Sequence, residues 1–222
     1  MKEKRTIRVQ GRAVVSGERD LVILRFSLNS KAMSYGTSLE SMYKRVEMLR
    51  QELESVGVDR TKLKTSNLSV SPHFESVKDK YVFSGYVASQ NMKLELPMDR
   101  QHLNQVLDRV TESKSGAEMR ISFGLKDESA LRQRALEEAV ANARKNAETL
   151  AKAAGVKLGN LLQVDYGWSE VYFRSEESSG LVIANREARD APDVEPEGAR
   201  LEDSVTTIWE MDGGRRRQNL EP

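Results

Sequence analysis

Few residues in this chain could do chemistry, and none of them stands in a recognised catalytic motif. The 222 residues include two histidines, His73 and His102, and no cysteine. A Ser-His-acid triad is formally possible, but no GxSxG sequence or similar context supports one. A histidine metal site would need both rings to converge with carboxylates, and no ligand spacing predicts this. Without cysteine, disulfides, thiolate metal sites and cysteine nucleophiles are excluded. We therefore predict no catalytic residue, no cofactor and no metal.

Two asparagines, Asn142 and Asn146, are the other polar candidates. They lie one helical turn apart, at the edge of the apolar arc of a helix predicted over residues 127–155. One interpretation is a polar contact to a ligand or to a neighbouring subunit. The other is a pair at the flank of the helix, bonded to the backbone of a nearby loop.

The helix that carries these asparagines is the clearest local structure in the sequence. Asp127 or Ser129 can cap its start, and Gly155 can end it. Its buried face is mostly alanine, and small side chains allow close approach, so we expect the helix to pack tightly on a sheet. At 100° per residue, its apolar arc contains Leu131, Ala135, Leu136, Ala139, Val140, Ala143, Ala147, Leu150, Ala151 and Ala154.

The overall composition restricts the classes of partner. Lys and Arg total 35 and Asp and Glu total 34, which gives a net charge of +1, and the charges are interspersed. A nucleic-acid surface normally has a stronger basic bias, so we predict no nucleic-acid partner. No apolar run approaches the ~18 residues that a membrane span needs. The N-terminal stretch lacks the apolar core of a signal peptide, which predicts a cytoplasmic protein as written, or an exported one if a leader was removed.

Hydrophobic periodicity predicts an α+β fold, with a largely antiparallel or mixed sheet of about seven strands packed by three helices. The helices are expected over 34–56, 99–110 and 127–155. The strands are expected over 6–15, 21–28, 63–74, 81–96, 121–125, 161–168 and 204–211, the first two forming a hairpin. We expect a single domain over 5–213. Within it, residues 169–201 are expected to form a long exposed loop, and residues 214–222 follow as a polar basic tail.

The strand predicted over 81–96 is apolar on both faces near its start. Tyr81 and Phe83 alternate with Val82 and Tyr86, so both faces need cover. Simple core burial and a homo-oligomer contact through Tyr81, Phe83 and Tyr86 are both open interpretations.

Specific phrases in the sequence resemble the SIMPL-domain family, to which the bacterial YggE-like proteins belong. They are IRVQGRAVV, DRTKLKTSNLSVSPHF, HLNQVLDRV and ALEEAVANARKNAETLAKAAGVKLGNLLQV, and the likeness spans residues 5–211. Asn142 stands where the family usually has an acidic residue, and Asn146 where it usually has lysine. The residues of the helix and its turn that match the family pattern are Ala141, Ala143, Arg144, Ala147, Glu148, Leu150, Ala151, Gly155 and Val156.

The resemblance implies an α+β fold, a tendency to oligomerise, with ring assemblies known in the family, and an unsettled biochemical role. It also implies links to oxidative-stress defence and, in animals, to signalling by protein association, and it supplies no catalytic residue. Many bacterial members are exported. From all of this we expect a non-enzymatic module that self-assembles or binds a protein. The alternative is an enzyme or small-ligand carrier with an unrecognised site between sheet and helices.

Overall fold

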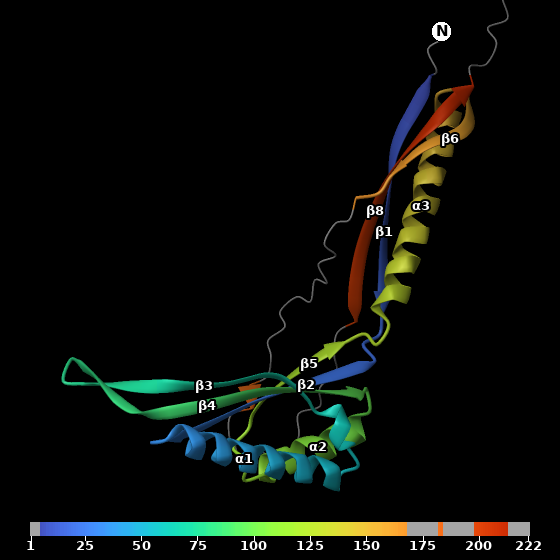
Figure 1. Cartoon of the computed structure of the whole chain (residues 1–222). Coiled ribbons are helices and arrows are strands. Elements are labelled where there is room, and N and C mark those ends of the chain that lie inside the picture. The colour runs from blue at the N-terminus through green and yellow to red at the C-terminus, as the bar shows by residue number, and fades with distance from the viewer. Residues whose placement is uncertain (1–4, 168–181, 184–197, 213–222) are drawn as a thin grey trace, which may run out of the picture. The chain divides into compact units, whose positions relative to one another are not determined.

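The computed structural model describes residues 5–167, 182–183 and 198–212 (Figure 1). These residues form three α-helices and eight strands, one of them two residues long, in two antiparallel sheets. The predicted α+β class is therefore confirmed, with the strands divided between two sheets. Most of the loop predicted over 169–201, and the tail predicted over 214–222, lie outside the described residues.

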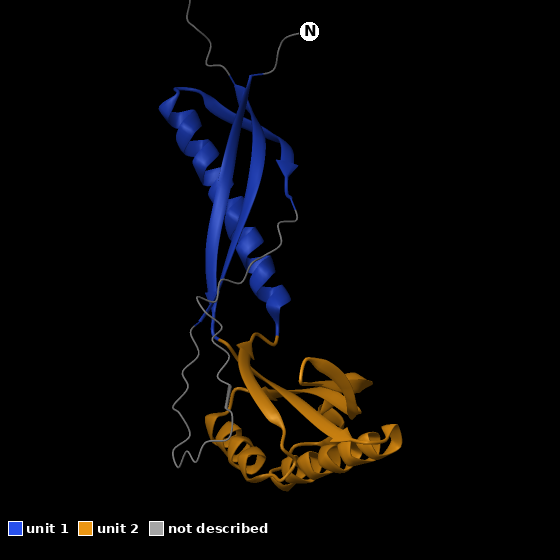
Figure 2. Cartoon of the chain, turned by 90° about the vertical axis from the view of Figure 1, so that its left-hand side faces the viewer, with its two compact units in different colours: residues 1–18, 127–176, 197–222 blue, residues 19–126, 177–196 orange. Residues whose placement is uncertain are grey.

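The chain divides into two compact units (Figure 2). Unit 1 combines residues 1–18, 127–176 and 197–222, and unit 2 combines residues 19–126 and 177–196. Each unit has its own sheet and its own buried cluster of side chains. Whether the two behave as the single domain predicted over 5–213 is a separate question, and that domain assignment stays a prediction.

Unit 1 contains a three-stranded sheet with one long helix on it. The strands are β1 (Thr6–Gly17), β6 (Lys157–Asp165) and β8 (Ala199–Asp212), in the order β1-β8-β6, and the helix is α3 (Glu128–Ala153). The α3 face that meets the sheet is alanine-rich, as expected. Its fully buried members are Ala135, Ala139, Ala143 and Ala147.

Both ends of α3 are fixed by local contacts that the sequence predicts. The Asp127 carboxylate accepts a hydrogen bond from the Ala130 amide at 3.0 Å, so Asp127 is the N-cap. Ser129 supports it by donating to the same carboxylate, and this bond is the main reason why the pKa of Asp127 is lowered. At the other end Gly155 adopts a φ of 67°, a left-handed conformation that suits glycine and stops the helix.

Unit 2 contains a five-stranded sheet in the order β3-β4-β2-β5-β7, with helices α1 and α2 packed on it. Its core includes Leu24, Phe26, Met42, Leu49 and Met92, which are all at most 1% exposed. The elements of this unit are β2 (Leu21–Ala32), α1 (Tyr35–Ser55), the short 3-10 helix η1 (Arg60–Lys62), β3 (Lys64–Val77), β4 (Lys80–Pro97), α2 (Arg100–Glu112), β5 (Glu118–Gly124) and β7 (Val182–Ile183).

Two of the strand predictions are wrong. The hairpin predicted for 6–15 and 21–28 does not form, because β1 pairs with β8 while β2 pairs with β4 and β5. Alternation identifies a strand but carries no information about a distant partner. The last strand also begins at Ala199, five residues before the predicted start. Its alternation is interrupted by a buried carboxylate at Asp203, which hid the first part of the strand.

Candidate assembly surface

The β3–β4 hairpin continues past the end of the neighbouring strand β2. The last pair between β2 and β4 is Ala32 with Tyr86, so the residues of β4 before that point pair only with β3. We call residues 74–83 the arm. Its two-residue turn, Lys78 and Asp79, has φ values of 50° and 60°. Positive φ at both positions is typical of a type I′ hairpin turn.

A bulge at the base of the arm changes which side chains share a face. His73 pairs with Gly85 and Phe74 pairs with Phe83, so Ser84 is an extra residue in β4. Gly85 has a φ of 115°, and a Cβ there would lie 2.4 Å from the carbonyl oxygen of Ala32. This position therefore requires glycine.

Because of the bulge, Phe83 and Tyr86 lie on the same face. Their ring centroids are 5.4 Å apart. The sequence prediction that they lie on opposite faces was wrong, since simple alternation assumes an uninterrupted strand. Tyr81 is two residues from Phe83 in a continuously paired segment and so shares its face. The three residues named as an oligomer contact are therefore brought to one side of the hairpin.

This face is aromatic, and much of it is open to solvent. Tyr35, Tyr86, Phe83 and Phe74 make three consecutive edge-to-face contacts, with centroids 5.4–5.9 Å apart. Tyr81 is 83% exposed, Phe74 is 50% exposed and Phe83 is 41% exposed. Edge-to-face packing orders the rings without removing them from water. The arm thus presents a pre-ordered apolar surface, which we call the aromatic face: Tyr35, Phe74, Tyr81, Phe83 and Tyr86.

Among the described residues, no contact joins the two histidines, so they do not form a common site. His73 lies inside β3, not at a strand end as predicted, and its Nε2 is 3.9 Å from Glu75 Oε1. Lys31 is the closer partner of Glu75 and is the main cause of that carboxyl's lowered pKa. His102 lies in the first turn of α2, as predicted. Among the described residues, no group of three or more His, Cys, Asp or Glu could hold a metal ion.

The predicted asparagine pair bonds to backbone, but to a strand and not to a loop. Asn142 donates to the carbonyl of Arg12 at 2.8 Å, and Asn146 donates to the carbonyl of Gln10 at 2.9 Å. One flank of α3 thus follows the backbone of β1, which is an edge strand of its sheet. Covering an edge with a helix is a known protection against unwanted strand pairing.

Arg134 extends the same series by donating to the carbonyl of Ser16 at 3.2 Å. From Arg134 to Asn146 the helix rises ~18 Å, and from Ser16 to Gln10 the strand rises ~20 Å. Because these two distances are nearly equal, each donor on the helix lies beside its acceptor on the strand. Alternate carbonyls of an edge strand point away from the sheet, which is why donors on the helix flank can reach them.

We expect the double substitution Asn142→Ala/Asn146→Ala to lower the free energy of unfolding by ~1–2 kcal/mol, because two hydrogen bonds to partly exposed carbonyls are lost. Chemical denaturation would measure this. Lys145→Ala, an exposed change on the same helix, is the control and should alter stability by only a few tenths of a kcal/mol. Assembly should be unchanged in the double variant. Lost assembly with intact stability would instead favour the interpretation of a contact to a neighbouring subunit.

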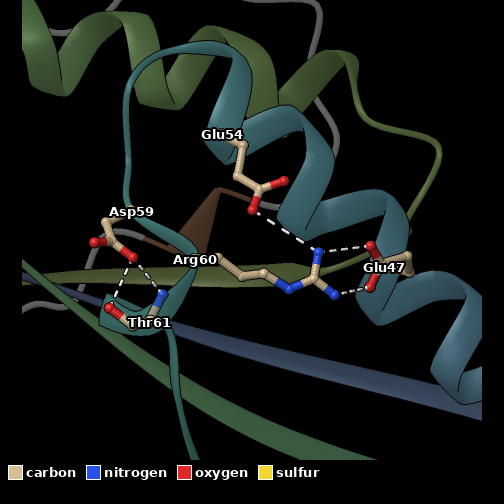
Figure 3. A network of polar contacts seen from close by, with 5 residues as sticks. All are labelled: Glu47, Glu54, Asp59, Arg60 and Thr61. Carbon is tan, nitrogen blue, oxygen red and sulfur yellow. Dashed lines mark hydrogen bonds and ion pairs between the residues drawn. The ribbon is translucent and has the colours of Figure 1, made fainter.

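A polar network in unit 2 fixes the segment that follows α1 (Figure 3). Both Nη atoms of Arg60 bind the Glu47 carboxylate, at 2.7 and 2.5 Å, and Nη1 lies 3.8 Å from Glu54. Asp59 caps η1 by accepting from the amide and the hydroxyl of Thr61, each at 2.7 Å. The hydrogen bond from Arg60 is the largest cause of the lowered pKa of Glu47. Every acid in the network is engaged by a neighbour, so its role is to position the chain.

In unit 1, the buried carboxylate of Asp203 is satisfied by two donors. The Tyr166 hydroxyl donates to it at 3.1 Å and the Ser204 amide donates at 2.7 Å. Burial of the hydroxyl is the main cause of the raised pKa of Tyr166, and the hydrogen bond to Asp203 adds to it. The pair explains why an acid is tolerated on the inner face of β8. No periodicity in the sequence signals it, since Tyr166 and Asp203 are 37 positions apart.

No helix in the described part of the chain combines the length and apolar character needed to cross a membrane. The sequence matches the model of a known family. The family described as SIMPL, protein of unknown function (DUF541), matches residues 7–209. The chain belongs to this family, and the resemblance predicted from the sequence is confirmed.

Three bacterial proteins are among the relatives that this chain resembles. An uncharacterized protein YggE from Edwardsiella ictaluri is 26% identical over 206 residues, covering 90% of this chain and 84% of that protein. YggE from Escherichia coli K12, also uncharacterized, is 26% identical over 157 residues, covering 70% of this chain and 63% of that protein. A Brucella melitensis protein named 26 kDa periplasmic immunogenic protein is 23% identical over 163 residues, covering 71% of this chain and 65% of that protein. The name places the Brucella protein in the periplasm, and the compartment of the present chain stays a prediction.

Proposed function

We propose that this chain is a non-enzymatic module that assembles with copies of itself through the aromatic face of the arm. The observation that carries the proposal is the exposure of ordered rings on a hairpin segment that pairs with no further strand among the described residues. An ordered apolar surface binds with little loss of side-chain freedom, because the rings already contact each other before binding. Association with a second protein would use the same surface, and a role in stress response rests only on the family resemblance.

The size of the surface is suitable for a specific contact. A buried aromatic side chain removes ~150–250 Å² from water, and a half-exposed ring can still bury about half of that, so the five rings of the aromatic face supply roughly half to three quarters of the ~800 Å² per partner of a standard interface. The alternative of an enzyme or small-ligand carrier has no supporting arrangement among the described residues.

We expect Tyr81→Ser/Phe83→Ser to weaken self-association at least ~30-fold, because each lost aromatic anchor removes about 1 kcal/mol or more of binding energy. Sedimentation velocity over a concentration series would measure the change. Val14→Ser is the matched control, since Val14 is 65% exposed but lies on β1 in unit 1. Circular dichroism should show that both variants keep the wild-type fold. A wild-type chain that stays monomeric at ~100 μM, well above typical interface affinities, would overturn the proposal.

A further inference from the structure

Four basic side chains stand in a row across the sheet of unit 2. Lys64 of β3 pairs directly with Lys93 of β4, Lys93 pairs with Arg25 of β2, and Arg25 pairs with Arg120 of β5. Directly paired residues of antiparallel strands share a face, so one cation from each of four adjacent strands projects to the same side. We call these four residues the basic row.

The basic row lies on the face of the sheet that the helices do not cover. The residues next to it along each strand, including Leu24, Phe26, Met92 and Met119, are buried in the core that contains α1 and α2. Alternation therefore directs the row to the opposite face. Lys64, Arg25 and Arg120 are exposed and Lys93 is half-buried. Adjacent strands lie ~4.8 Å apart, so the row extends over roughly 14 Å.

This arrangement opposes folding of the sheet, because like charges placed directly opposite each other are destabilising. Compensation is incomplete. Lys93 forms an ion pair with Glu95, and Arg25 donates from Nη1 to the neutral hydroxyl of Ser122 at 2.7 Å. The side chain of Arg120 has no hydrogen-bond or ion-pair partner among the residues that the structure describes. Three adjacent like-charged pairs do not stabilise the sheet, so the simpler explanation of the row is that it binds a ligand.

We propose that the basic row binds an extended acidic polypeptide segment of a partner protein. In an extended chain, side chains on one side repeat every ~6.7 Å, so carboxylates at alternate positions i, i+2 and i+4 span ~13 Å, close to the length of the row. Arg25 and Arg120 can each hold a carboxylate through two parallel N–H donors. The proposal concerns a different surface from the aromatic face and does not depend on self-assembly.

The chemistry of the face favours carboxylates over a nucleic acid. The positions two residues before and after Arg25, Lys93 and Arg120 share their face and carry no aromatic ring for a base to stack on; they are Ile23, Ser27, Asn91, Glu95, Glu118 and Ser122. Glu95 lies beside Lys93 on the same face and would repel a continuous line of phosphates. A peptide can leave a neutral residue opposite this carboxylate.

Fluorescence anisotropy of the full chain with a labelled peptide of alternating glutamate and serine tests the proposal. We expect saturable binding that weakens with added salt and falls ~30-fold or more in Arg25→Glu/Arg120→Glu, because two attractive contacts become repulsive. Lys114→Glu/Lys145→Glu makes the same change in net charge at exposed positions outside the row and should bind as the wild type does. Equal binding by all three proteins would overturn the proposal.

Two further measurements would identify a different ligand of the basic row. If an oligothymidine strand binds more tightly than the peptide and is lost in the same variant, the ligand is a nucleic acid and the proposal is wrong. If the variant loses self-association in sedimentation while the peptide never binds, the occupant is a second copy of the chain, which also overturns it.

Thermal stability distinguishes two causes of lost peptide binding, namely the loss of binding contacts and the misfolding of the variant. Arg25→Glu should raise the thermal midpoint by ~3 °C, because opposite charges would then face Lys93 and Arg120. Lost peptide binding together with increased stability supports the proposal. Lost binding together with a lowered midpoint would show that Arg25 serves the fold, and would overturn it.

Discussion

Replacing Gly11 with alanine is expected to destabilise unit 1 by about 3 kcal/mol or more. A Cβ at this position would lie 2.1 Å from the carbonyl oxygen of Ala139 and 2.3 Å from the amide nitrogen of Ala143. Both are backbone atoms of α3, so no side-chain rotation can relieve the overlap. The helix would have to move away from β1, and the hydrogen bonds of Asn142 and Asn146 would weaken with it.

Gly36→Ala is the matched control for this change. Gly36 lies in the first turn of α1, and nothing is within 4 Å of a Cβ built there. Alanine should therefore stabilise the helix by ~0.5–1 kcal/mol through its higher propensity. Urea denaturation followed by circular dichroism measures both variants. If Gly11→Ala were as stable as the wild type, the result would contradict the close approach of α3 to β1 described here.

Replacing Phe26 with alanine is expected to destabilise unit 2 by ~3–5 kcal/mol, because the change opens a cavity at the centre of its core. Phe26 is 1% exposed and lies between Met92 of β4 and Met119 of β5 in the register of the sheet. Ile23→Ala is the control. It shortens a half-buried apolar side chain of the same strand on the other face, and should have less than half the effect. A loss below ~1 kcal/mol for Phe26→Ala, the range of a surface change, would contradict this description of the core.

The two substitutions together test the single-domain prediction. If the chain unfolds as one cooperative domain, either substitution shifts one common transition. If the units unfold separately, Gly11→Ala moves the transition of unit 1 and Phe26→Ala moves that of unit 2. Tryptophan fluorescence should report on unit 1 through Trp209, because this side chain packs against the core of that unit. Circular dichroism reports both units.

The helices could be predicted from the sequence because their signals are local. Asp127 caps α3 and Gly155 ends it, as the sequence indicated. Strand pairing could not be predicted in the same way. The pairing of β1 with β8 joins residues almost the full length of the chain apart, and no local pattern encodes it. The buried Asp203 shows the same limit, since its donor, Tyr166, comes from another strand.

The candidate surfaces could be predicted only in part. Apolar residues on both faces near Tyr81 indicated only that both faces of this strand need cover, and left core burial and an oligomer contact open. That Phe83 and Tyr86 share a face depends on a bulge at Ser84, and Gly85 was the one available signal for it. The basic row had no sequence signal. Its members come from four strands and meet only through the register of the sheet.

The pairing of the first strand with the last also determines the order in which the chain can fold during synthesis. The elements of unit 2 from β2 to β5 are complete by Gly124, so this sheet can form while the rest of the chain is still being made. β1 must wait for β8, about 180 residues later, which takes roughly 10–40 s at ~5–20 residues per second. During that time the ribosome-bound chain carries a strand whose apolar positions have no sheet to join. A chain interrupted before Ala199 would contain β2 to β5 of unit 2 but would leave β1 without its partner strand, and such an unpaired apolar strand is a target for chaperones and proteases.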